Sequence, residues 1–224
     1  MTKTEFDEFA HLYKNLASQN TKFFNADYDY FGRVRAEIVG RFSDPNTRTI
    51  LDFGCGIGLS ISPLRDIFSS AEIVGCDPSQ DSLEIARTRE PECKFLAPEA
   101  IPAVPRFDIV MSVCVFHHIA PANRDATLRY CYERLNRGGY LFVFEHNPYN
   151  PVTRHLVSTC PFDQDAILLT KAETVARLRR TGFDIASAGY FLFFPWFLRF
   201  IRPLEKFIGW LPLGGQYFVA GARP

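Results

Sequence analysis

The chain has 224 residues, with 25 basic and 25 acidic side chains and a sequence pI of about 7.0. This length suits one domain with a sizeable core, and the balanced charge argues against a protein that binds nucleic acid by charge alone. With 47% hydrophobic and 22% charged residues, the composition is that of a folded globular protein and excludes a disordered one.

The cysteines and the N-terminus predict a reduced, cytoplasmic protein. The six cysteines form no Cys-x-x-Cys pair and have no histidine at zinc-ligand spacing, so neither a disulfide framework nor a metal site is expected. The first ten residues carry acidic side chains where a signal peptide needs basic ones. The longest apolar run, residues 190–198, is interrupted by Pro195 and is far shorter than the roughly 20 residues of a membrane span.

Residues 1–45 are predicted to form an N-terminal helical lid, and residues 46–224 one α/β domain with inserts at about 147–170 and 190–212. In chain order, strands are expected at 49–53, 71–77, 93–96, 107–113, 140–145, 183–188 and 216–220, and helices at 60–69, 79–89, 123–135 and 171–181. Strands joined by single helices favour a parallel sheet that is covered on both faces.

A glycine-rich loop follows the first predicted strand in the sequence Leu-Asp-Phe-Gly-Cys-Gly-Ile-Gly, residues 51–58. Glycine at every second position makes a turn without β-carbons, so a ligand can lie against the backbone, and the next helix presents free N–H groups to a negative group. Two other interpretations stay open. The loop is also compatible with a simple strand-to-helix turn or with a nicotinamide site, although its third glycine comes one residue earlier than in Gly-x-Gly-x-x-Gly.

Asp77 ends the second predicted strand, 19 positions after Gly58. A carboxylate at this place lies beside the glycine-rich loop and can accept hydrogen bonds from both hydroxyls of a ribose. The sequence Asp-Pro-Ser is also a good helix start, so a purely structural role in capping the next helix is the alternative.

Four segments, in this order and spacing, resemble class I S-adenosylmethionine-dependent methyltransferases of the small-molecule type: residues 51–58, 73–77, 107–118 and 135–143. The resemblance implies a Rossmann-like sheet of seven mostly parallel strands, the last antiparallel, with helices on both faces. It also implies an N-terminal helical lid and an aromatic insert between strands six and seven. The implied cofactor is S-adenosyl-L-methionine, with S-adenosyl-L-homocysteine as product.

The resemblance also implies which residues contact the cofactor: Tyr13, Asp52, Gly54, Gly56, Gly58, Asp77, Pro78 and Ser112. The glycines and Asp52 would surround the methionine part, Asp77 would hold the ribose, and Tyr13 would close over the cofactor. One departure from the family follows the third predicted strand, where Ala97 stands in place of the aspartate that lies near adenine.

His117 and His118 follow the fourth predicted strand, whose end borders the methyl donor in sheets of this type. Imidazole titrates near neutral pH and is the commonest general base. His117 resembles the base that deprotonates hydroxyl groups in plant-type small-molecule O-methyltransferases, and Glu145 matches the glutamate near that base. A carboxylate on one ring nitrogen would orient the imidazole. The alternative is a histidine pair that only packs or caps the next helix.

The loop after the fifth predicted strand is expected to line the substrate pocket through His146, Asn147 and Tyr149. Its Asn-Pro-Tyr sequence is similar to the tetrapeptide with which base-amine methyltransferases hold an exocyclic nitrogen, but that tetrapeptide follows the fourth strand. An ordinary proline-bounded turn is the alternative. Long loops beside a ligand site commonly select substrate, and this one continues to residue 170 with a short helix expected near 152–158.

Residues 190–212 form an aromatic insert in which apolar side chains share one helical face and basic side chains share the other. The apolar set is Phe197, Phe200, Ile201, Leu204, Ile208 and Leu211. Pro203 is predicted to divide the insert into two short helices. Such a pattern is typical of a helix that lies in a membrane surface. Packing on the sheet edge, a roof over the pocket and a homodimer contact are the alternatives.

The predicted function is methyl transfer from S-adenosylmethionine to a small acceptor, apolar or lipid-linked, through a hydroxyl oxygen. The transfer is an in-line displacement, so the protein mainly supplies alignment and exclusion of water. Three alternatives stay open: methylation of a protein or RNA nitrogen, a catalytically inactive partner subunit that binds the cofactor, and a nicotinamide oxidoreductase.

Overall fold

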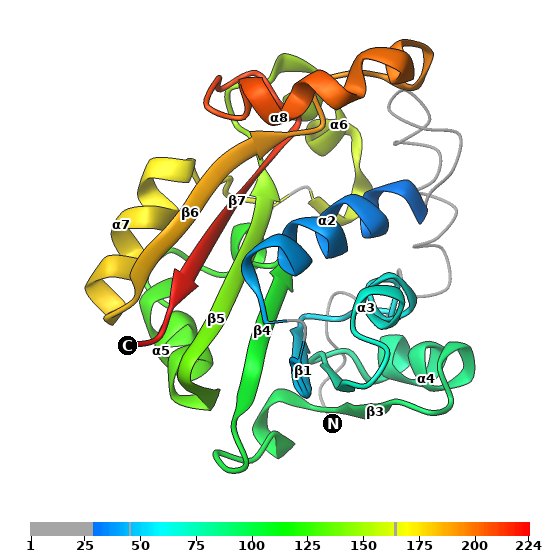
Figure 1. The fold of residues 1–224 in the computed structure, drawn as a ribbon, viewed down its shortest axis with the longest axis vertical. Coiled ribbons are helices and arrows are strands. Elements are labelled where there is room, and N and C mark those ends of the chain that lie inside the picture. Colours follow the sequence, from blue (N-terminus) through cyan, green and yellow to red (C-terminus); the bar gives the residue numbers. More distant parts are fainter. Residues whose placement is uncertain (1–28, 45, 164) are drawn as a thin grey trace.

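Seven strands form one sheet in the order β3-β2-β1-β4-β5-β7-β6 (Figure 1). They are β1 (Thr49–Phe53), β2 (Glu72–Cys76), β3 (Lys94–Leu96), β4 (Phe107–Val113), β5 (Leu135–His146), β6 (Asp184–Phe191) and β7 (Gln216–Ala222). The computed structural model describes residues 29–44, 46–163 and 165–224. Only β7 runs against its neighbours β5 and β6, while the other pairs are parallel. The predicted Rossmann-like sheet with an antiparallel last strand is confirmed.

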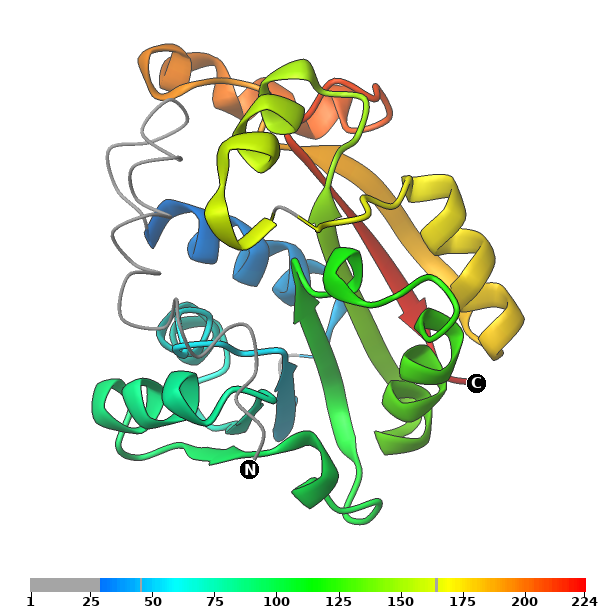
Figure 2. The same ribbon diagram turned by 180° about the vertical axis from the view of Figure 1, so that it is seen from behind.

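Helices cover both faces of the sheet (Figures 1 and 2). The first face carries α2 (Asp29–Phe42), α3 (Ile61–Ile67) and α4 (Gln80–Arg89). The second carries α5 (Arg124–Arg134) and α7 (Lys171–Thr181). Two further helices, α6 (Pro151–Thr159) and α8 (Glu205–Ile208), lie beyond the carboxyl end of β5. Right-handed crossovers between parallel strands place helices on the two faces in this way.

The core consists of two apolar layers, because successive side chains of each strand point to opposite faces of the sheet. In β5, Leu141 and Val143 pack toward α5 and α7, whereas Phe142 and Phe144 pack toward α2 and α3. All four side chains are fully buried. These continuous apolar strands hold the loops at their carboxyl ends in place.

Two strands, β5 and β6, extend furthest past their predicted bounds. β5 begins at Leu135, five residues before the expected start, because Leu135 pairs with Phe107 while Gly138 adopts a positive φ of 77°. β6 continues to Phe191, because Phe191 still pairs with Gln216 of β7. In both cases backbone pairing with a neighbouring strand continues through residues whose local sequence favours a turn or an insert.

The aromatic insert differs from its predicted amphipathic helix. Residues Trp196–Leu204 form a 3-10 helix, and α8 follows directly after it. A 3-10 helix has three residues per turn, so residues three apart share a face and the period of an α-helix does not apply. Phe197 and Phe200, on either side of a kink at Leu198, are both exposed, while the guanidinium of Arg202 turns inward and lies 4.0 Å from the centre of the Tyr30 ring of α2. The prediction that the basic side chains of the insert share one face is therefore wrong.

The N-terminal region is described only from residue 29 onward, so the predicted lid over residues 1–28 lies outside the described residues. The following helix, α2, packs on the sheet through its buried residues Ala36 and Val39. In the described part of the chain, no helix combines the length and apolar character needed to cross a bilayer. All six cysteines are free thiols.

Candidate active site at the carboxyl edge of the sheet

The order of the strands reverses between β1 and β4, since β2 lies on one side of this pair and β5 on the other. In open sheets of this kind, ligands bind beyond the carboxyl ends of the strands at such a reversal. The loops after β1, β2, β4 and β5 all meet at this edge (Figure 2). They contain most of the residues that the sequence singled out.

The glycine-rich loop after β1 is tied to the end of β2. The N–H groups of Gly54 and Cys55 donate to the carbonyl oxygen of Cys76 at 2.8 and 3.0 Å. Gly54, Gly56 and Gly58 all have positive φ values, which side-chain-bearing residues rarely adopt. A β-carbon at Gly56 would meet no atom of the described residues within 4 Å. The backbone of Gly56 thus borders open space in which a ligand fits.

Asp77 is buried directly after β2, and both of its carboxylate oxygens accept backbone hydrogen bonds. One accepts from the N–H of Gly56 at 2.9 Å, and the other accepts from the N–H of Ser79, also at 2.9 Å. Ser79 in turn caps α4, as its hydroxyl accepts from the N–H of Ser82. The capping alternative is therefore realised. The ribose role stays a prediction, and the neighbouring Pro78 is exposed.

Asp52 and Ser112 lie on adjacent strands at the reversal point, since Phe53 of β1 pairs with Ser112 of β4. Both side chains are buried, and no described residue forms a hydrogen bond with either oxygen of Asp52 or with the hydroxyl of Ser112. Burial and the nearby charge of Asp77 raise the pKa of Asp52 to about 7. Buried polar groups are nearly always hydrogen-bonded, so these two point to a missing polar partner.

His117 and Glu145 form a buried pair where β4 and β5 end. The Nδ1 atom of His117 lies 2.6 Å from one oxygen of Glu145, and the other oxygen accepts the N–H of Phe116 at 2.7 Å. Burial alone would lower the pKa of His117, but the two carboxylates of Glu145 and Asp163 outweigh it and raise that pKa to about 10. The same pairing holds the pKa of Glu145 below its usual value despite burial. The predicted contact between His117 and Glu145 is present.

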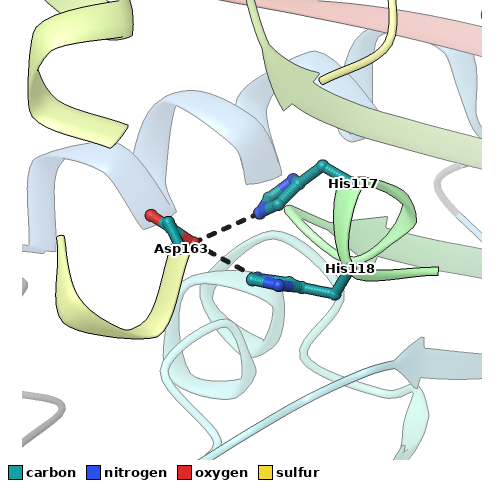
Figure 3. Close-up of side chains that lie close together, drawn as sticks. All are labelled: His117, His118 and Asp163. Carbon is teal, nitrogen blue, oxygen red and sulfur yellow. Dashed lines mark ion pairs between the residues drawn. The ribbon is translucent and has the colours of Figure 1, made fainter. Parts of the chain in front are cut away.

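Asp163 approaches the histidines from the long loop after α6 (Figure 3). Its Oδ1 atom lies 3.4 Å from Nε2 of His117 and 3.3 Å from Nε2 of His118. The ring of His146 lies beside His117, with ring centres 5.2 Å apart, and burial together with the charge of His117 lowers the pKa of His146 to about 4. Three histidines and two carboxylates thus converge at this edge.

The other two predicted substrate residues lie away from this cluster. Asn147 is fully buried, and its amide nitrogen donates to the carbonyl oxygens of Pro212 and Gly214 at 3.0 and 2.8 Å. It therefore ties the loop after β5 to the segment that enters β7. Tyr149 is 60% exposed. Contact of either residue with a substrate stays a prediction.

Arg124 and Asp163 were not singled out by the sequence. The buried Nε of Arg124 donates to the carbonyl oxygens of Phe116 and Ile119, both at 3.0 Å, and so fixes the short 3-10 helix that carries the two histidines. Nothing in the sequence distinguishes Arg124 from the other arginines. For Asp163, the one available signal was its place in an insert predicted to select substrate.

Comparisons with known proteins agree with this geometry. Residues 51–141 match a protein family described as a methyltransferase domain. The chain is 30% identical over 124 residues to a ubiquinone biosynthesis O-methyltransferase of Mesorhizobium japonicum, a match that spans 49% of this chain and 48% of that relative. The family match includes the glycine-rich loop and Asp77. This match identifies residues 51–141 as a methyltransferase domain.

Solved structures share the fold of this methyltransferase domain over nearly the whole chain. A possible histamine N-methyltransferase from Thermotoga maritima has a TM-score of 0.70 at 22% identity and covers 98% of each chain. The magnesium protoporphyrin IX methyltransferase of Synechocystis with bound S-adenosylmethionine has a TM-score of 0.61 at 15% identity, covering 97% of this chain and 94% of that one. At these identities the likeness shows the fold. The chain spans about half the length of the curated relative from Mesorhizobium.

The residues of the methyltransferase domain fit an adenosyl cofactor. Asp52 offers a buried carboxylate without a partner among the described residues, which suits the ammonium group of a methionine moiety. The glycine-rich loop leaves open space at Gly56, and the carboxylate of Asp77 is hydrogen-bonded to that loop. Tyr13 belongs to the residues outside the described part of the chain. Ala97, at the family's adenine position, precedes a short 3-10 helix and carries no polar group.

Proposed function

We propose that this protein transfers a methyl group from S-adenosylmethionine to the hydroxyl oxygen of a small acceptor, apolar or lipid-linked. The observation that carries the proposal is the buried pair of His117 and Glu145, 2.6 Å apart, at the carboxyl ends of β4 and β5. Transfer to a hydroxyl needs a group that takes the proton, whereas transfer to a free amine does not. The name of the Mesorhizobium relative, an O-methyltransferase, supports an oxygen acceptor.

In this proposal the acceptor oxygen attacks the methyl carbon in line with the departing sulfur, and S-adenosylhomocysteine leaves. With its pKa raised to about 10, the His117 ring is charged in the ligand-free protein, so it first releases its Nε2 proton to solvent as the acceptor displaces Asp163. The hydroxyl proton then passes to Nε2, while Glu145 holds Nδ1 and stabilises the protonated ring. An acceptor hydroxyl that takes the place of Asp163 at Nε2 removes one of the two carboxylates that favour the charged ring. Arg124 keeps the histidine segment in position through its bonds to Phe116 and Ile119.

Two measurements test the proposal. Calorimetry should show saturable binding of S-adenosylhomocysteine and none of NAD, which would remove the nicotinamide alternative. Release of S-adenosylhomocysteine should then be followed with apolar hydroxyl compounds and with matched amines. Turnover of the hydroxyl compounds alone supports the proposal. Turnover of amines alone would refute the oxygen acceptor, and binding without any turnover would favour the inactive partner subunit.

We expect cofactor affinity to depend on pH through Asp52. Its pKa is about 7, above the ordinary value for aspartate, so below that pH the ligand-free protein holds a proton on this carboxyl. An ammonium group favours the carboxylate, so binding at lower pH must release the proton. The dissociation constant of S-adenosylhomocysteine should therefore rise as pH falls below about 7, approaching tenfold per pH unit, and stay level above it.

Calorimetry of S-adenosylhomocysteine binding across this pH range measures the effect, and Asp52→Asn is the matched variant. The asparagine cannot titrate, so its dissociation constant should be weaker and should lack the rise at low pH. If the variant keeps the full pH dependence of the native chain, the proton belongs to another group and the role of Asp52 is refuted.

The aromatic insert supports an apolar or lipid-linked acceptor. Its exposed hydrophobic side chains are Trp196, Phe197, Phe200, Leu204, Phe207 and Trp210, each 45–74% exposed. Arg199 and Lys206 are exposed among them. Aromatic side chains interspersed with basic ones bind the interface of membranes that contain anionic lipids. The insert also lies beyond the carboxyl end of β5, at the same end of the sheet as the histidine cluster (Figure 1).

We therefore expect the protein to float with anionic lipid vesicles at low salt, and to do so less at high salt because charge attraction is screened. The double variant Phe200→Asp with Trp210→Asp should lose flotation, since it places two charges in the contact surface. Val104→Asp, which changes an exposed hydrophobic residue in another part of the fold, is the control and should float normally. Native protein that stays with the unbound fraction at low salt would reject membrane contact.

A further inference from the structure

We infer that His117, His118 and Asp163 form a binding site for one divalent transition-metal ion such as Zn²⁺. Each residue offers one ligand atom, and the three atoms lie within 4.8 Å of one another (Figure 3). They come from two separate segments, the 3-10 helix Phe116–His118 after β4 and the 3-10 helix Pro161–Asp163 after α6. No metal site was expected from the sequence, because the cysteines form no Cys-x-x-Cys pair and have no histidine at zinc-ligand spacing.

The distances match ligands of a common ion better than they match hydrogen bonds. Nε2 of His117 and of His118 lie 3.4 and 3.3 Å from Oδ1 of Asp163. Nitrogen and oxygen ligands bind zinc at about 2.1 Å, so two of them at the tetrahedral angle lie roughly 3.4 Å apart. Hydrogen bonds between such groups are shorter, about 2.7–3.2 Å.

The second observation is the Nε2 atom of His117. It is buried, it points toward Oδ1 of Asp163, and at 3.4 Å it forms no hydrogen bond there or with any other described residue. The opposite ring nitrogen, Nδ1, contacts Glu145 at 2.6 Å. Histidines that bind metals nearly always have their other ring nitrogen on a carboxylate or carbonyl, which fixes the ring and makes Nε2 the ligand. His117 has this arrangement.

The donor set selects the class of ion. Two imidazoles and one carboxylate suit zinc, iron, cobalt or nickel ions, whereas Mg²⁺ and Ca²⁺ prefer oxygen ligands. The two carboxylates of Asp163 and Glu145 balance a double positive charge in this buried place. Asp163 also lines an open groove of about 500 Å³ beside α6, so an ion can enter from solvent.

An ion with three protein ligands keeps at least one position open for an oxygen of a bound molecule. A bound hydroxyl loses its proton more easily there, because the positive charge stabilises the oxygen anion. This consequence rests on the proposed function. In that case the ion would lower the pKa of the bound hydroxyl, whose proton would leave to solvent, and His117 would act as a ligand. The metal site itself stands on the three ligand atoms alone.

The test uses the full chain after removal of metals with a chelator. Titration with Zn²⁺ in a calorimeter, and the metal content after gel filtration, should give about one ion per chain. Asp163→Asn and His118→Ala remove ligands and should weaken binding more than Glu145→Gln. The latter should cost about 10- to 100-fold, as loss of a carboxylate behind a ligand histidine does. His155→Ala, on the exposed face of α6, is the control and should bind as the native chain does.

Because six free thiols also attract zinc, Co²⁺ serves as a second probe. The absorption spectrum of Co²⁺ bound to the native chain should show nitrogen and oxygen ligands without the band of cobalt bound to thiolate. This measurement uses the native chain alone, so it does not depend on whether the variants fold. Native affinity in both ligand variants, a thiolate band, or no saturable binding by the native chain would overturn the site. S-adenosylhomocysteine binding and methyl transfer are measured on the same metal-free samples. They test the proposed function, whereas the metal titration tests the metal site, so failure of one is distinguished from failure of the other.

Discussion

The His117→Ala variant is expected to turn over hydroxyl acceptors about 10²- to 10⁴-fold more slowly than the native chain, with nearly unchanged affinity for S-adenosylhomocysteine. The ring lies with Glu145 at the ends of β4 and β5, while the predicted cofactor contacts lie on the loops after β1 and β2. Loss of the imidazole therefore removes the acceptor-side chemistry and leaves the cofactor side intact. The measurements are the turnover number by release of S-adenosylhomocysteine and the dissociation constant by calorimetry.

Two further variants test whether the loss of turnover is specific to the imidazole of His117. Glu145→Gln keeps an oxygen that can accept from Phe116 but removes the charge beside Nδ1, so turnover should fall less than in His117→Ala. His155→Ala removes an exposed histidine from another segment and should leave turnover unchanged. Equal losses of turnover and of cofactor affinity in His117→Ala would show that the residue supports the fold of the site, and would contradict a role in proton transfer.

The second large effect is expected for Asp77→Ala, which should weaken S-adenosylhomocysteine binding by about 1.5–3 kcal/mol, the scale of hydrogen bonds to a charged group. That range corresponds to roughly a 10- to 150-fold rise in the dissociation constant. Asp77 acts in two ways in this proposal, because its carboxylate accepts ribose hydroxyls and also holds the N–H of Gly56 in the glycine-rich loop. Calorimetry on folded protein measures the change.

Ser79→Ala provides the control for Asp77. Ser79 caps α4 next to Asp77, so its loss should lower the free energy of unfolding by about 1 kcal/mol without weakening cofactor binding. If both variants lower stability and neither changes the dissociation constant, Asp77 is only part of the helix start. The ribose role would then be abandoned in favour of the capping alternative.

Much of the fold could be predicted because its signals are local. The apolar strand before Gly54, the glycines themselves and the helix cap at Ser79 each depend on residues close in the sequence. The ends of β5 and β6 could not be predicted, since pairing with Phe107 and with Gln216 extends both strands past residues that locally favour other structures. Helix type was also beyond local signals, as the 3-10 helix of the aromatic insert shows.

The residues of the site also divide into those that the sequence could predict and those that it could not. His117 and Glu145 could be placed together from sequence, because both follow adjacent parallel strands whose carboxyl ends meet at one edge. Asp163 and Arg124 could not be found, because their roles arise from loops and helices that return to this edge from elsewhere. Asn147 looked like a substrate residue in the sequence, yet the structure engages its amide with the backbone before β7.

The sequence by itself therefore determined the sheet, the glycine-rich loop and the family of the domain, since these depend on short motifs in a fixed order along the chain. Only the tertiary structure decided which charged groups meet. It showed that Asp52 is buried without a described partner and that Asp163 reaches both histidines. The reason is physical: the charge state and ligand chemistry of a side chain depend on burial and on neighbours a few ångströms away, and chain order does not specify these neighbours.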